Sequence, residues 1–170
     1  MNTKALAYMQ AKSSKSGIFL GDDTGVRKGR EKWSAVLAVR FRGERAQDTG
    51  QKGDTYSATK HEPITVIREW RPSTAQFLEE VWNTNRHIDE VLFEFVRYDA
   101  SEQEHVFATM KLTNVVVAHV ELRFGNTAEW REGSDPEPTL EHIGLVPQAI
   151  EFKVKGSGGD AVANYEKNAS

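Results

Sequence analysis

The chain has 170 residues, a net charge of −3 and a pI near 6.0, so no excess of basic charge favours nucleic acid or an anionic membrane as partner. It contains no cysteine, which excludes disulfides, thiolate nucleophiles and cysteine-ligated zinc. No apolar signal-peptide segment opens it and no stretch is apolar enough to span a membrane, so we expect one soluble domain made in the cytoplasm.

The first part of the chain alternates between predicted strands and polar segments. Residues 5–11 form a short strand, and residues 64–71 form another. Between them, residues 33–42 are predicted to be a strand whose apolar side chains occupy alternate positions: Ala35, Leu37, Val39 and Phe41. Residues 43–60 are rich in glycine and charge, and this loop exceeds the usual ceiling of about 12–15 residues. We therefore expect it to be a functional or projecting arm.

A single short helix is predicted over residues 73–85. Ser73 and Gln76 have the spacing of a capping box, and Pro72 ends the preceding strand. A polar face that includes Glu80 lies opposite one apolar stripe, made of Phe77, Leu78, Val81 and Trp82. We expect this stripe to face the core.

Long strands dominate the second half of the chain. Residues 87–98 form one, and residues 104–124 form the next, with apolar side chains at even positions from 106 to 112 and from 116 to 124. An unbroken strand of that length would span roughly 65–70 Å. That is too long for a domain of this size, so we expect the strand to bend at Asn114, the polar residue in the apolar series. The polar odd positions indicate a sheet with one solvated face.

The chain ends in one more predicted strand, over residues 146–154, and a tail from residue 156 that is rich in glycine, serine, aspartate and asparagine. That composition predicts a flexible tail without regular structure. The pattern as a whole predicts a mainly antiparallel β-structure closed by one helix.

The candidate chemical motifs all have simpler explanations. Two Asp-Thr-Gly triplets, at 23–25 and 48–50, lie in charged loops and not at the buried strand ends that an acid-protease dyad needs. The five histidines lack the spacings of a metal site. The basic run 27–32 has no interleaved aromatic residues, which favours a solvated loop or a subunit contact over a nucleic-acid site. We expect no enzyme activity, no cofactor and no metal ion.

A projecting arm and free sheet edges without a catalytic cluster are typical of an assembly subunit. The polar side chains of the long strand would suit the wall of a water-filled channel, and the candidates are Thr109, Lys111, Thr113 and His119. An ordinary solvated sheet face has the same alternation, so both interpretations stay open at this point.

The order and the local amino-acid sequence of the central segments resemble the Hcp family, the tail-tube proteins of the type VI secretion system. The resemblance covers residues 5–155, is best over 61–124, and rests on five segments: 61–73, 75–82, 87–97, 111–115 and 149–154. It implies an antiparallel β-barrel of two packed sheets with one flanking α-helix over residues 1–155, followed by the flexible tail 156–170.

The resemblance also implies a function. Hexameric rings would stack into a hollow tube, with a VgrG-like spike protein, a contractile sheath and small effectors as partners, and the tube would be secreted through the type VI apparatus. In that family the long loop after the second strand reaches the next ring, which makes residues 43–60 the inter-ring arm, with Arg45, Asp48, Lys52, Asp54 and Tyr56 as candidate contact residues. A tube protein of a phage tail or of an extracellular contractile injection particle is the alternative, ahead of an enzyme or effector in its own right.

Overall fold

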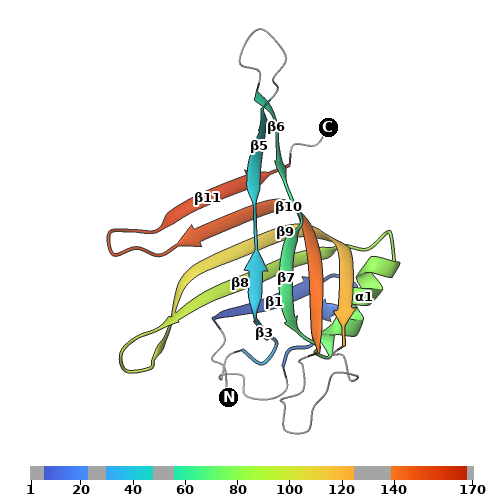
Figure 1. The fold of residues 1–170 in the computed structure, drawn as a ribbon, viewed down its shortest axis with the longest axis horizontal. Helices are drawn as coiled ribbons and strands as arrows, with labels where there is room; N and C mark the ends of the chain where they lie inside the picture. Colours follow the sequence, from blue (N-terminus) through green and yellow to red (C-terminus); the bar gives the residue numbers. More distant parts are fainter. Residues whose placement is uncertain (1–5, 23–29, 48–55, 125–138, 168–170) are drawn as a thin grey trace.

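The structure, a computed structural model, describes residues 6–22, 30–47, 56–124 and 139–167, with the backbone alone at 45–47 and 56–61. Within these residues, one helix lies among antiparallel strands (Figure 1), and the helix is α1, Ser73–Trp82. The strands are β1 (Ala7–Ser13), β2 (Gly17–Ile18), β3 (Ser34–Val36), β4 (Ala38–Arg40), β5 (Gly43–Gln47), β6 (Tyr56–His61), β7 (Ile64–Glu69), β8 (Ile88–Tyr98), β9 (Glu104–Arg123), β10 (Leu140–Val154) and β11 (Ala161–Glu166).

The described strands form one large sheet and one separate hairpin. The large sheet has the order β2-β1-β8-β9-β10-β7-β4, with β11 beside β10 and β3 beside β1, and the hairpin consists of β5 and β6. The ladder is not a closed ring, yet β3 pairs with β1 while β4 pairs with β7, and only Leu37 separates the two strands. One chain segment thus reaches both ends of the curled sheet. The predicted fold class, antiparallel β with two packed sheets and a flanking helix, is confirmed.

The long strand β9 changes the side that it buries at Asn114. Asn114 has φ +48°, in the left-handed region that asparagine tolerates better than most residues. Buried residues lie at even positions before it and at odd positions directly after it: Ala108, Met110 and Leu112, then Val115 and Val117. The predicted bend is therefore confirmed. The prediction that even positions stay inside after it fails at Val116, which is 52% exposed because the bend reverses the alternation.

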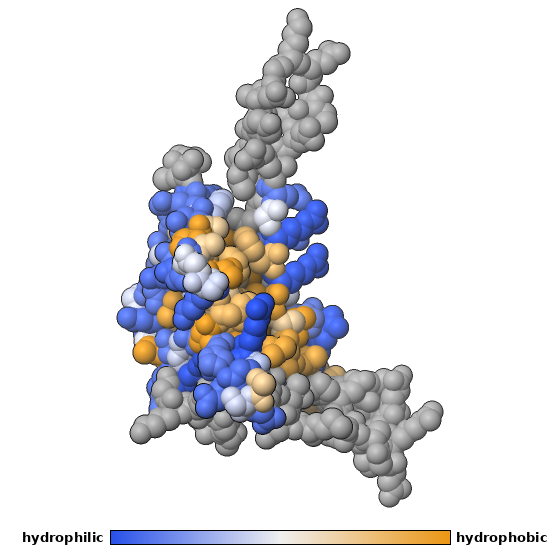
Figure 2. Space-filling view, turned by 90° about the vertical axis from the view of Figure 1, so that its left-hand side faces the viewer, coloured by the Kyte–Doolittle hydropathy of each residue, from blue (hydrophilic) through white to orange (hydrophobic). Residues whose placement is uncertain are grey.

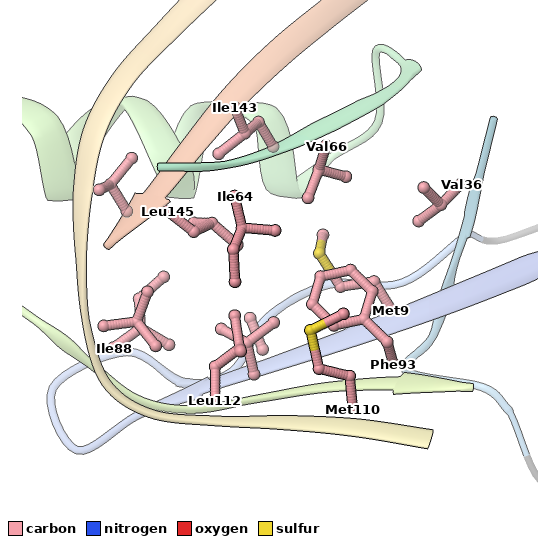
Figure 3. Packing of buried hydrophobic residues seen from close by; sticks show 14 of the residues in the cluster. Met9, Val36, Ile64, Val66, Ile88, Phe93, Met110, Leu112, Ile143 and Leu145 are labelled. Carbon is pink, nitrogen blue, oxygen red and sulfur yellow. The ribbon is translucent and has the colours of Figure 1, made fainter. Parts of the chain in front are cut away.

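The core lies inside the curled sheet, where the two halves face each other (Figure 3). The strands β1, β7, β8, β9 and β10, together with α1, supply its fully buried side chains, among them Ile64, Val66, Phe77, Ile88, Phe93, Leu112, Ile143 and Leu145. Burial of each such side chain is worth about 1.5–3 kcal/mol. The packing joins the two halves into one unit.

The segment predicted as one strand over 33–42 is split. Val36 is buried, whereas Leu37 is 55% exposed and Phe41 is also exposed, so of the large apolar residues in the predicted series only Val39 packs against the core. The cause is the passage from one partner strand to the other: the N–H of Leu37 donates to the carbonyl of Ile67 in β7, 2.9 Å away. Alternation of apolar and polar residues predicts the buried side only where a strand keeps the same partner, and here the partner changes from β1 to β7.

The predicted helix is present, but its capping box is not. The hydroxyl of Ser73 accepts a hydrogen bond from Nη2 of Arg68 (2.9 Å), and Oε1 of Gln76 accepts one from the N–H of Leu20 (2.8 Å). The side chains that the spacing assigned to the cap are therefore bound instead to Arg68 in β7 and to the backbone of Leu20, after β2. Two further positions on the helix differ from the prediction: Glu80 is buried at 4% exposure, and Trp82 is 72% exposed.

Two segments predicted without regular structure contain strands. Within 43–60, β5 and β6 pair across an antiparallel hairpin, and within the tail 156–170, β11 pairs with β10 from Ala149 to Val154. Residues 156–160 supply the turn before β11, and Tyr165 packs against the core. Glycine and serine in that turn dominated the composition, and the short Ala-Val-Ala-Asn-Tyr run after it was too brief to indicate a strand.

Candidate assembly surfaces

A polar sheet face runs across β8, the first half of β9 and the second half of β10. Thr109, Lys111 and Thr113 share this face. Their cross-strand neighbours are Glu94, Leu92 and Glu90 in β8, and Lys153, Glu151 and Ala149 in β10. Carboxylates and ammonium groups thus alternate across the strands, which leaves the face wet but without a strong field of one sign.

Lys111 is the most firmly held of these side chains. Its Nζ lies 2.7 Å from Oε2 of Glu90, and this hydrogen bond and charge raise the pKa of Lys111, with Glu151 adding to the effect. The ammonium stays charged at physiological pH, and its partner neutralises it locally. Thr109, Lys111 and Thr113, three of the four residues predicted to line a channel, thus lie on one face of the sheet.

His119 lies on the other half of the bent sheet. It faces Gly144 in β10, where β10 also pairs with β7 at Thr65, and a register shift between Gly144 and Leu145 separates this part of the ladder from the rest. The imidazole lies close to the glycine: a Cβ at position 144 would sit 2.2 Å from Cε1 of His119. The structure thus separates His119 from the three other predicted channel residues, because the bend and the register shift turn β9 between them.

The predicted arm is only partly described. Arg45 lies in β5 and Tyr56 in β6, whereas Asp48, Lys52 and Asp54 lie outside the described residues. The hairpin pairs with no strand of the large sheet within the described part of the chain, and it projects away from that sheet (Figure 1). A two-stranded ribbon is marginally stable by itself, so a surface on another molecule would be needed to fix its position.

Several large apolar side chains are exposed, including Leu6, Leu37, Trp82, Val116 and Phe124. Figure 2 shows a contiguous hydrophobic area, bordered by hydrophilic side chains, on the side of the molecule that faces away from α1. Contiguous apolar surface of this kind marks protein contacts more often than it occurs on a free monomer.

A buried polar network ties α1 to the sheet, and the sequence analysis missed it. Arg68 in β7 and Glu141 in β10 lie directly opposite each other and form an ion pair at 1% and 0% exposure. Desolvation lowers the pKa of Arg68, and Glu141 opposes this shift. One signal was available: Arg68 continues the inward series of Ile64 and Val66, so a charge in that position needs a buried partner.

A second cluster of charged side chains forms around Arg30, which belongs to the basic run 27–32. Nη2 of Arg30 lies 2.6 Å from Oε2 of Glu94, and Nη1 lies 2.8 Å from Oε1 of Glu104. The guanidinium also lies 4.1 Å from the ring centroid of Tyr8. The hydroxyl of Tyr98 donates to Oε2 of Glu104, and desolvation, with hydrogen bonding and charge, raises the pKa of Tyr98 to about 12. Arg30 therefore binds both strands of the β8–β9 hairpin near its turn.

The described residues contain no group of three histidine, aspartate or glutamate side chains arranged for a metal ion. Nor does any helix within them have the length and apolarity needed to cross a membrane. What the geometry does offer is surfaces: a wet sheet face, a projecting hairpin and exposed apolar side chains.

Comparison with known proteins agrees with this picture. A family model described as "Type VI secretion system effector, Hcp" matches residues 8–153. Among solved structures, a mutant of Hcp1 from E. coli EAEC 042 is 18% identical, with a TM-score of 0.76 over 96% of this chain and 99% of that one. The secreted protein Hcp3 from Pseudomonas aeruginosa is 15% identical, with a TM-score of 0.67 over 95% and 99%.

Hcp1 from Salmonella typhimurium is 13% identical, with a TM-score of 0.66 over 96% of this chain and 95% of that one. At these identities the structural likeness establishes a shared fold. No curated protein matches the chain.

Proposed function

Because the chain belongs to the Hcp family of the type VI secretion system, we propose that it is a structural subunit of the inner tube of that apparatus. The observation that carries this proposal is the family match over residues 8–153, which spans the sheet from β1 to β10. The fold shared with Hcp structures over nearly the whole chain supports it. The role is mechanical, and it requires no catalytic residue.

In this proposal six copies form a ring, and rings stack head to tail into a hollow tube. Contacts that do not close along the tube axis allow indefinite stacking. A VgrG-like spike protein caps the tube, and contraction of a surrounding sheath expels it. The subunit is thus assembled in the cytoplasm and leaves the cell through the apparatus, together with small effectors in the lumen.

The polar face of β8, β9 and β10 is the surface that we assign to the lumen, with Thr109, Lys111 and Thr113 on its wall. Two of its charges are paired within the subunit: Lys111 with Glu90, and Glu94 with Arg30. A wall of this kind wets the channel but holds cargo of neither sign strongly, which suits a conduit that must release what it carries. His119 belongs to the other half of the sheet, so we leave it out of the lumen.

The β5–β6 hairpin, with the segment between its strands, is the surface that we assign to stacking. Its isolation from the large sheet within the described residues supports this role, because a projecting ribbon gains stability from a neighbouring ring. The candidate contact residues are Arg45, Asp48, Lys52, Asp54 and Tyr56.

Light scattering of the purified protein tests the proposal. A ring of six copies of 19.1 kDa has a mass of about 115 kDa (6 × 19.1), and larger species should appear as rings stack. The proposal predicts this mass at micromolar concentration. A single species of 19.1 kDa at every concentration up to the solubility limit would contradict it.

A further inference from the structure

An apolar groove opens near the β8–β9 hairpin, at the end of the sheet away from α1. It has a volume of about 580 Å³ and is lined mainly by hydrophobic side chains, among them Leu6, Val36, Leu37, Val39, Phe95 and Phe107. Leu6 and Leu37 are also among the most exposed large apolar residues of the described chain. The groove lies in the size range of sites that take up an apolar group.

One cation at the groove rim has no carboxylate partner within the described residues. The guanidinium of Arg97 lies 4.0 Å from the ring centroid of Phe107, and its side chain is exposed. The groove therefore presents an apolar floor with a positive charge at its edge. The complementary group is an aromatic side chain with a carboxylate beside it.

The exposed surface of α1 carries that combination. Trp82 is 72% exposed, and Glu79 stands one helical turn before it with its side chain 59% exposed. The only ion pair of Glu79 within the described residues is with Arg86, at 3.3 Å and open to solvent. An exposed pair of this kind is worth little, so the carboxylate can change partners at small cost. Tryptophan and arginine are the residues that most often dominate interfaces.

The two surfaces lie at opposite ends of the molecule. Strand β8 begins at Ile88, six residues after α1, and ends at Tyr98, which lines the groove. At about 3.3 Å per residue, this strand separates the two surfaces by roughly 30 Å, and Figure 1 shows α1 at one end of the sheet and the β8–β9 hairpin at the other. Trp82 therefore cannot occupy the groove of its own chain.

We infer that the groove receives α1 of a second copy of this chain, with Trp82 on its floor and Glu79 beside Arg97. Two different surfaces at opposite ends of one subunit make a heterologous contact, which forms a ring when the rotation closes. This inference rests on the proposed function and deepens it, because it names the side chains that join neighbours within a ring.

Charge exchange across the contact tests it. Arg97→Glu and Glu79→Arg, measured separately and together, are compared by light scattering over a dilution series. Each single variant should raise the concentration for half assembly about tenfold or more, since it places like charges together. The double variant restores an opposite pair and should return to within about threefold of the wild type.

Trp82→Ala removes the aromatic anchor and should weaken assembly by about 30-fold or more, the effect of losing a typical hot-spot side chain. Trp82→Phe is the matched control and should retain most of the assembly. Circular dichroism of each variant establishes that the fold is intact, which an exposed position permits.

Three outcomes would count against the inference in different ways. Normal assembly of Trp82→Ala and Arg97→Glu would overturn the contact between α1 and the groove. The arm of another copy, or a different protein, would then be the candidate occupant of the groove, and the tube proposal would stand. A double charge variant no better than the single variants would also overturn it. A wild type that stays monomeric overturns the proposed function together with this contact.

Discussion

The buried pair Arg68 and Glu141 gives the sharpest test of how this fold is held together. Both side chains are fully buried and directly opposed across β7 and β10. Arg68 also donates to Ser73 at the start of α1 and lies 5.0 Å from the ring centroid of Phe77. The pair therefore connects the helix to both strands, and its removal should be felt in global stability.

The magnitude follows from the cost of an uncompensated charge. Arg68→Met or Glu141→Leu alone leaves one ion buried without its partner, which costs about 3–5 kcal/mol. The double variant removes both charges and replaces them with side chains of similar volume. It should then lie within about 2 kcal/mol of the wild type, since what remains lost is the hydrogen bond to Ser73 and the contact with Phe77.

Urea unfolding of the four proteins at pH 7, followed by circular dichroism at one fixed protein concentration, measures this. The fixed concentration matters because assembly adds to apparent stability. The double-mutant cycle should give a coupling energy of several kcal/mol. Single variants that each cost under about 1 kcal/mol, or costs that simply add in the double variant, would refute the argument that the pair is a desolvated, mutually dependent unit.

Three further predictions concern the arm, a buried acid and a close contact in the sheet. Deletion of residues 47–53 should leave rings intact and abolish stacking, as seen by electron microscopy; long tubes from the deleted protein would refute the arm assignment. Burial raises the pKa of Glu80, whose carboxylate oxygens have no hydrogen-bond partner within the described residues. The folded state therefore binds the proton of Glu80 more tightly than the unfolded state does. As pH rises above 4.5, the ordinary pKa of this group, the folded protein loses the stability that this proton provides. Glu80→Gln should therefore gain stability relative to the wild type as pH rises above 4.5 in urea titrations, and a difference that does not change with pH would contradict this. Gly144→Ala places a Cβ against the imidazole of His119, which must move, and should lower the free energy of unfolding, with His119→Ala restoring most of it in the double variant; an undiminished cost in the double variant would place the strain elsewhere.

The strands were the most predictable part of this fold, because alternation of apolar and polar side chains is a local property. It indicated the long strand β9, and the polar Asn114 within an apolar series indicated its bend. The side buried after the bend was not predictable in the same way. It depends on the twist that a left-handed residue imposes and on the pairing with β10, neither of which the alternation records.

The same limit applies to the candidate surfaces. Thr109, Lys111 and Thr113 lie on one face, since no irregularity separates them along the strand, and their place on a channel wall stays a prediction. His119 lies farther along β9, beyond the bend and the register shift opposite Gly144, and alternation does not reveal this separation. Trp82 is exposed and Glu80 is buried, the reverse of the prediction, because the buried side of α1 is the one that carries Ser73, Phe77 and Glu80.

Electron cryomicroscopy of the assembled protein is the most direct test of the central claim, that identical copies complete the surfaces which one chain leaves open. The claim predicts rings of six subunits around an open channel, with Thr109, Lys111 and Thr113 on the channel wall and the β5–β6 hairpins between stacked rings. Particles without a channel, or a ring with this sheet face on its outer side, would contradict it.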